Sequence, residues 1–232
     1  MVQPLVAAGP GKELESGLFP GVDPLSTPFW QDGENVDFRN GGPMTAKGAT
    51  ALATLPGTVV EMAQAFHDGD QRIYAAVANG VFMRSSISGL SSLGSFPTQG
   101  TPQFETFGSF LLGTNNVDPP MYWKNTGSFV AIPSLPFTRA KLFHRRDNHV
   151  IALNTSNGQN AYEWCSASDV DDWEPTDENS AGNNWIRDLD SEIVACVDMG
   201  SQVAVYSKET MGLIRFVGQP NVFAHNPALN VS

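Results

Sequence analysis

A repeated unit is the sequence feature that most constrains the fold of this chain. After Pro56, four segments each contain an apolar strand, a turn, and a second strand with two large apolar residues placed two positions apart. The later residue of that pair is Met83, Trp123, Trp164 and Phe216 in the four units. The units are therefore spaced by 40, 41 and 52 residues, and a polar insertion at residues 176–191 explains the longer step.

The first two steps match the length of a four-stranded β-propeller blade. Each unit also has one further strand candidate on each side. Those before the pair are 59–66, 103–107, 141–145 and 193–197, and those after it are 92–96, 128–132, 172–174 and 221–224. The pattern predicts an all-β fold of about four four-stranded, propeller-like blades. Stacking blades buries the faces that one small sheet leaves exposed. The sequence leaves open whether the blades form a closed ring, an open one, or one completed by another chain.

The chain divides into three predicted parts: an N-terminal arm with a hairpin at residues 1–57, the propeller-like domain at 58–228, and a tail at 229–232. The hairpin is predicted because residues 35–39 alternate like a strand and an Asn-Gly turn follows at Asn40. A hairpin this short needs a surface to pack on.

Charge and composition exclude several classes of partner. The chain carries 13 basic and 24 acidic side chains, a net charge of −11, which disfavours tight binding to nucleic acid or to an anionic membrane. A negative wall suits a duct through which DNA slides without adhering. No apolar run approaches the roughly 20 residues of a membrane-spanning helix. The N-terminus lacks the basic and apolar regions of a signal peptide, so assembly in a host cytoplasm is expected.

The sequence predicts no catalytic residue, no cofactor and no metal site, and therefore a protein that is not an enzyme. The four histidines lack zinc-ligand spacing, and neither a Gly-x-Ser-x-Gly elbow nor a P-loop is present. Ser166 to Trp173 resembles the Asp-box turn of sialidase-type propellers, although a plain Asx-type turn explains it as well. The acidic residues from Asp169 to Glu178 are interpreted as a solvated loop rather than as calcium ligands.

One basic cluster stands out. Its members are Arg139, Lys141, Arg145 and Arg146. On a strand, the first three would share one face and the fourth would lie on the other. Two interpretations remain open: contact with an acidic partner subunit or with DNA phosphates, and a charged edge strand that blocks edge-to-edge association.

Several stretches resemble the tail nozzle or packaged-DNA stabilisation proteins of short-tailed bacteriophages. The first is the hairpin at 34–41 followed by Lys47 and Gly48, which is similar to that family's opening pattern. The second runs from Tyr162 to Pro175 and is similar to a recurrent Trp-x-Ser…Asp-x-Trp element of phage propeller blades. The strand pair at 202–216 also resembles the family.

The resemblance implies a structural virion protein of the phage tail. It implies a homo-oligomeric ring, expected to be a hexamer, below the portal and adaptor and in contact with tail fibre or needle proteins. Double-stranded DNA would pass transiently through the lumen, and no membrane partner is expected. The hairpin would dock on a neighbour through Asn35, Val36, Phe38, Gly41, Lys47 and Gly48.

Two other functions stay open. A glycan-binding or sialidase-like propeller would stack sugars on exposed aromatic residues such as Trp123, Trp164 or Trp173. A generic scaffold for protein partners is the third hypothesis, because propellers host many functions and the fold alone does not choose among them.

Overall fold

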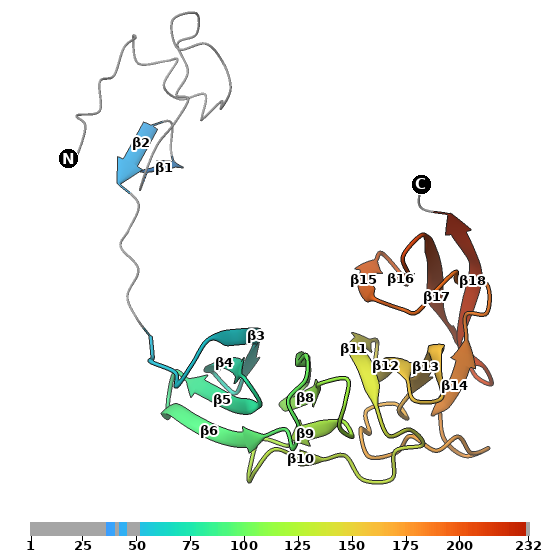
Figure 1. The fold of residues 1–232 in the computed structure, drawn as a ribbon, viewed down its shortest axis with the longest axis horizontal. Helices are drawn as coiled ribbons and strands as arrows, with labels where there is room; N and C mark the ends of the chain where they lie inside the picture. The colour runs from blue at the N-terminus through green and yellow to red at the C-terminus, as the bar shows by residue number, and fades with distance from the viewer. Residues whose placement is uncertain (1–35, 40–41, 46–51, 231–232) are drawn as a thin grey trace, which may run out of the picture. The chain divides into compact units, whose positions relative to one another are not determined.

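The computed structural model describes residues 36–39, 42–45 and 52–230. The chain divides into two compact units, Met1–Leu52 and Ala53–Ser232. In the first unit, β1 (Val36–Arg39) pairs antiparallel with β2 (Gly42–Thr45), so the hairpin that the alternation predicts is present (Figure 1). Of the predicted docking residues, Asn35, Gly41, Lys47 and Gly48 lie outside the described residues.

The second unit consists of four four-stranded antiparallel sheets, which we call blades 1 to 4 (Figure 1). Blade 1 contains β3 (Val59–His67), β4 (Asp70–Val77), β5 (Gly80–Ser85) and β6 (Gly89–Ser95). Blade 2 contains β7 (Gln103–Phe107), β8 (Phe110–Thr114), β9 (Met121–Trp123) and β10 (Val130–Ala131). Blade 3 contains β11 (Ala140–Arg146), β12 (His149–Thr155), β13 (Gly158–Trp164) and β14 (Gly182–Trp185). Blade 4 contains β15 (Ala195–Met199), β16 (Gln202–Tyr206), β17 (Thr210–Gly218) and β18 (Val222–Asn230).

Within each blade the strands follow chain order, and each pairs with the next. Short turns make this possible. Asp68 and Gly69 connect β3 to β4 with φ values of 49° and 77°, and two such residues in succession match the twist of a hairpin. Asp147 begins the turn between β11 and β12, also with a positive φ of 50°. The all-β, propeller-like fold predicted from the repeat is therefore confirmed.

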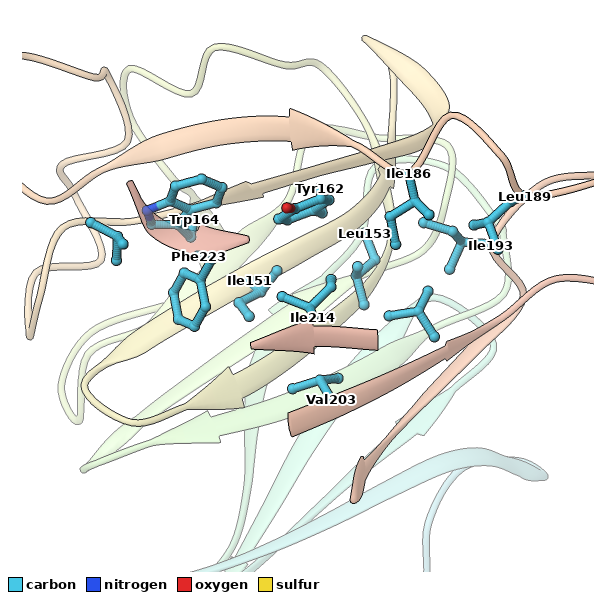
Figure 2. Packing of buried hydrophobic residues seen from close by; sticks show 12 residues of the cluster. Ile151, Leu153, Tyr162, Trp164, Ile186, Leu189, Ile193, Val203, Ile214 and Phe223 are labelled. Carbon is cyan, nitrogen blue, oxygen red and sulfur yellow. The ribbon is translucent and has the colours of Figure 1, made fainter. Parts of the chain in front are cut away.

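Hydrophobic clusters join each blade to the next. The first contains Tyr74, Val81 and Leu93 of blade 1 and Phe104, Leu111 and Trp123 of blade 2. The second contains Leu112 and Tyr122 of blade 2 and Phe143, Val150 and Trp173 of blade 3. The third contains Ile151, Leu153 and Trp164 of blade 3 and Val203, Ile214 and Phe223 of blade 4 (Figure 2). Burial between sheets, rather than within one sheet, supplies the core.

The first strand of each blade lies next to the first strand of the following blade, in the order β3, β7, β11 and β15. Side chains bridge these inner strands. The Gln103 side chain donates to the carbonyl oxygen of Phe143 at 3.2 Å and accepts from its N–H at 2.7 Å. The N–H of Arg145 donates to Glu105 Oε2 at 3.1 Å. Polar groups on the edge of β11 are thus satisfied by blade 2.

Two predicted boundaries differ from the structure. The fourth strand of blade 3 is β14, inside the segment interpreted as an insertion, and residues 172–174 form no strand. Trp173 is instead a buried residue of the turn, and its indole N–H donates to the Val170 carbonyl oxygen at 2.8 Å. At the C-terminal end, β18 continues to Asn230, two residues into the predicted tail. In the part of the chain described, no helix is long and apolar enough to span a membrane.

Candidate functional site at the basic strand β11

The structure separates the four residues of the basic cluster. Arg139 precedes β11 rather than sharing its face with Lys141 and Arg145. Its guanidinium donates to Asn116 Oδ1 at 2.6 Å and to the Thr155 carbonyl oxygen at 3.3 Å. Arg139 therefore connects a loop of blade 2 to the end of β12 in blade 3.

Lys141 ties blade 3 to the segment that leads into blade 4. Its Nζ lies 3.3 Å from Oε2 of Glu192. The same carboxylate accepts a hydrogen bond from Asn154 Nδ2 at 3.1 Å. The hydrogen bond from Asn154, followed by the contact with Lys141, holds the pKa of Glu192 below its ordinary value. The carboxylate is thus charged at neutral pH and neutralises Lys141.

Arg146 makes the second connection between blades 3 and 4. Its Nη1 lies 3.0 Å from Asp198 Oδ1 and donates to the Gly200 carbonyl oxygen at 3.1 Å. His144 Nε2 lies 3.2 Å from the same carboxylate oxygen. Burial acts to raise the pKa of Asp198, but the contacts with His144 and Arg146 keep it below its ordinary value.

Arg145 is the exposed member of the cluster, and no ion pair engages it within the described residues. Together with Arg146 it lines an open cleft of about 680 Å³, bounded by Phe107 and Phe110 of blade 2. Asp147 and Asp198 line the same cleft. The structure thus brings Arg145 and Arg146 together beside two carboxylates, a mixed charge pattern rather than a basic track for phosphates.

The tryptophans predicted as sugar platforms are core residues. Trp123, Trp164 and Trp173 are all buried. Their indole N–H groups donate to the carbonyl oxygens of Gly127 at 3.1 Å, Ser180 at 2.8 Å and Val170 at 2.8 Å. They cannot stack on a ligand without unfolding a blade, so this part of the glycan hypothesis is wrong.

A different tryptophan, which the sequence analysis did not select, is exposed. Trp185 at the end of β14 is 36% exposed and lines an open cleft of about 530 Å³ with Asn157, Gln159 and Arg187. Asn160 lines the same cleft, and its Oδ1 is a buried oxygen without a hydrogen-bond partner among the described residues. The signal that could have identified this cleft is a tryptophan that follows two asparagines in a polar segment.

The acidic loop is organised by its own hydrogen bonds. Asp169 Oδ1 accepts from the N–H of Asp171 at 3.0 Å, as the Asx-turn interpretation predicts. Both carboxylate oxygens of Asp172 accept from Asn179 Nδ2 at 3.0 Å, and Asp171 pairs with Lys124 of blade 2. Within the described ranges, no three His, Cys, Asp or Glu side chains gather as a metal site.

Comparisons with known proteins leave the family open. The chain matches no protein-family profile and no curated protein. Solved structures with a similar course of the chain include the N-terminal domain of Nup159 (TM-score 0.43, 10% identity, 68% of this chain and 46% of that one). The designed protein Ika8 (0.45, 12%, 76% and 54%) and the CNH domain of AfRom2 (0.46, 8%, 86% and 60%) are also similar. The chain spans about half the length of these structures, and likeness at this level carries no conclusion about function.

Proposed function

We propose that this chain is a non-enzymatic structural component of a bacteriophage tail, a nozzle or adaptor-associated ring that extends the DNA channel and helps retain or guide packaged DNA. The observation that carries the proposal is the use of the polar residues on β11. Glu192 and Asp198 bind Lys141 and Arg146 and thereby join blades. These groups are occupied in holding a scaffold together, which suits a structural role better than catalysis or tight phosphate binding.

The net charge of −11 also supports a channel role. Each phosphate that a channel wall binds adds attraction that ejection of the DNA must break. The cleft beside β11 balances Arg145 and Arg146 with Asp147 and Asp198, so it offers little net attraction to a duplex. A duct of this character would guide DNA without retaining it by adhesion.

Electron microscopy of negatively stained particles tests this function. The purified full chain is imaged alone and after mixing with the portal and adaptor proteins encoded in the same genome. We expect a ring with a central hole that joins the portal and adaptor assembly. If the chain binds neither protein at micromolar concentration, the result would contradict the tail function.

The Trp185 cleft favours a second candidate, binding of a glycan. An exposed indole face beside amide groups and a guanidinium is the chemistry that holds a sugar ring by stacking and hydrogen bonding. The test is a glycan array with the full chain and with Trp185→Ala as the matched control. Binding that the substitution removes would promote this candidate, and an array without a signal would eliminate it.

A further inference from the structure

The first blade presents exposed apolar side chains on one of its faces. Val60, Met62 and Phe66 of β3 are 53%, 58% and 70% exposed. The residues between them, Ala63 and Ala65, point the other way and pack on the cluster between blades 1 and 2. The same side of the sheet continues through Ala75, which is buried and lies opposite Met62, to the half-buried Phe82, which lies opposite Ala75. We call this surface, defined by Val60, Met62, Phe66 and Phe82, the leading face.

The fourth blade presents exposed apolar side chains on the side that faces away from blade 3. Val197 and Met199 of β15 are 50% and 47% exposed, while Cys196, the residue before Val197, points to the other side and packs on the cluster between blades 3 and 4. Val197 lies opposite Ala204, and Ala204 lies opposite Leu213. We call this surface, defined by Val197, Met199 and the half-buried Leu213, the trailing face; Ala204 on the same side of the sheet is buried. Among the described residues, each hydrophobic cluster joins consecutive blades, and none joins blade 1 to blade 4.

The two exposed faces match each other in chemistry. The contact between blades 3 and 4 includes the ion pairs of Lys141 with Glu192 and of Arg146 with Asp198. The inner-strand positions of the exposed faces carry no charge. They are Val60, Met62, Gln64 and Phe66 on the leading face and Ala195, Val197 and Met199 on the trailing face. The neighbouring strands add one arginine to each face. Arg84 lies opposite Ile73, which lies opposite Gln64. Arg215 lies opposite Gln202, which lies opposite Met199.

The contacts between consecutive blades indicate which surface fits each of the two faces. In each contact within the chain, the side of a blade that corresponds to the leading face packs on the side of the preceding blade that corresponds to the trailing face. The two exposed faces would therefore continue an interface that the chain makes three times. We propose that the leading face of one copy docks on the trailing face of a second copy, head to tail. Two such contacts, related by a two-fold axis, close a ring without an exposed blade face.

The number of blades sets the number of copies. The described residues of one chain form four blades, so two copies of these blades make a ring of eight, at the upper end of the usual range of about 4 to 8. Three copies would exceed that range. This inference deepens the proposed ring function and rests on it in one respect, that copies of the chain associate.

Light scattering and sedimentation of the full chain test the proposal with charge placed on one face at a time. Met62→Lys alters the leading face and Val197→Lys the trailing face, and both residues are exposed, so each variant can fold. Val117→Lys is the matched control, since Val117 is 51% exposed in the loop between β8 and β9, away from both faces. We expect the wild type and the control to have twice the mass of one chain. Each face variant should associate at least about 30-fold more weakly, because docking would bury an unpaired ammonium.

Mixing the two face variants gives the decisive result. The Met62→Lys copy keeps an intact trailing face and the Val197→Lys copy an intact leading face, so the equimolar mixture should recover a two-chain species that neither variant forms alone. Four results would each contradict the proposed contact: a mixture that stays monomeric, a face variant that still dimerises, a monomeric wild type, and a six-chain wild type. A wild type that is monomeric alone but joins the portal and adaptor would overturn only the docking proposal, whereas a two-chain ring that ignores them would overturn only the tail function.

Discussion

At the scale of single residues, Glu163 of β13 is a buried carboxyl in the middle of a blade. Its side chain is almost inaccessible to solvent. Oε1 accepts hydrogen bonds from Thr155 Oγ1 at 2.6 Å and from Asn157 Nδ2 at 3.1 Å. Burial is the main influence on the group and raises the pKa of Glu163 above its ordinary value, although both hydrogen bonds act in the opposite direction.

Replacing this carboxyl with an amide should stabilise the protein at alkaline pH. Because the folded pKa is raised, the stability that the protonated carboxyl contributes is complete below the unfolded value and is lost as the pH rises through the folded pKa. Glutamine stays neutral and can still accept both hydrogen bonds. We expect Glu163→Gln to raise the unfolding midpoint at pH 8 and to leave it nearly unchanged at pH 4, as measured by circular dichroism. Glu178→Gln, in an exposed position, is the control. An equal gain at both pH values would contradict this account.

At the scale of single elements, β14 shows where a sequence pattern fails. Its residues, Gly182 to Trp185, lack alternating apolar side chains, so the segment was interpreted as part of an insertion. The strand forms because β13 offers an open edge, on which Trp164 lies opposite Gly182. At Gly182 a Cβ atom would overlap the indole ring of Trp164. The glycine is required by packing across the strand pair, a cause that local sequence does not reveal.

Gly182→Ala tests this packing. The added methyl group must displace the Trp164 ring, so we expect a loss of about 1–3 kcal/mol in the free energy of unfolding, measured with urea. In a Trp164→Leu background the ring is absent, and the same substitution should cost much less. Equal costs in the two backgrounds would show that the backbone of β14, rather than Trp164, excludes a side chain.

At the scale of the whole molecule, the repeat alone predicted the blade architecture. A spacing of 40 and 41 residues between Met83, Trp123 and Trp164 suffices, because all three side chains are buried and lie in the third strands of three successive blades. The candidate site was predicted less well. Proximity in sequence suggested one basic patch, but Arg146 pairs with Asp198, 52 residues away. Such pairings depend on how two blades meet, which no local pattern contains.

The same pairing leads to a prediction about DNA. At 0.15 M salt the full chain should show no saturable binding to a labelled duplex below about 10 μM, because its net charge is −11 and Arg146 is neutralised. Asp198→Asn removes one of the two carboxylates that contact Arg146, since Asp147 stays 3.5 Å from its Nε, so weak, salt-sensitive binding should increase. Fluorescence anisotropy at two salt concentrations measures both. Tight binding by the wild type would contradict the neutral cleft.

The chain order of the strands has a consequence for how the molecule is made. Each blade is encoded by one contiguous segment, and each strand pairs with the strand that precedes it. Contacts between residues close in sequence form quickly, and folding can begin before the chain is finished. On the ribosome, blade 1 can complete its sheet while blade 2 is still being translated, and every later blade emerges beside a finished surface that orders it. The blades would thus fold one after another from the N-terminal end, and each finished blade would provide the surface on which the next one packs.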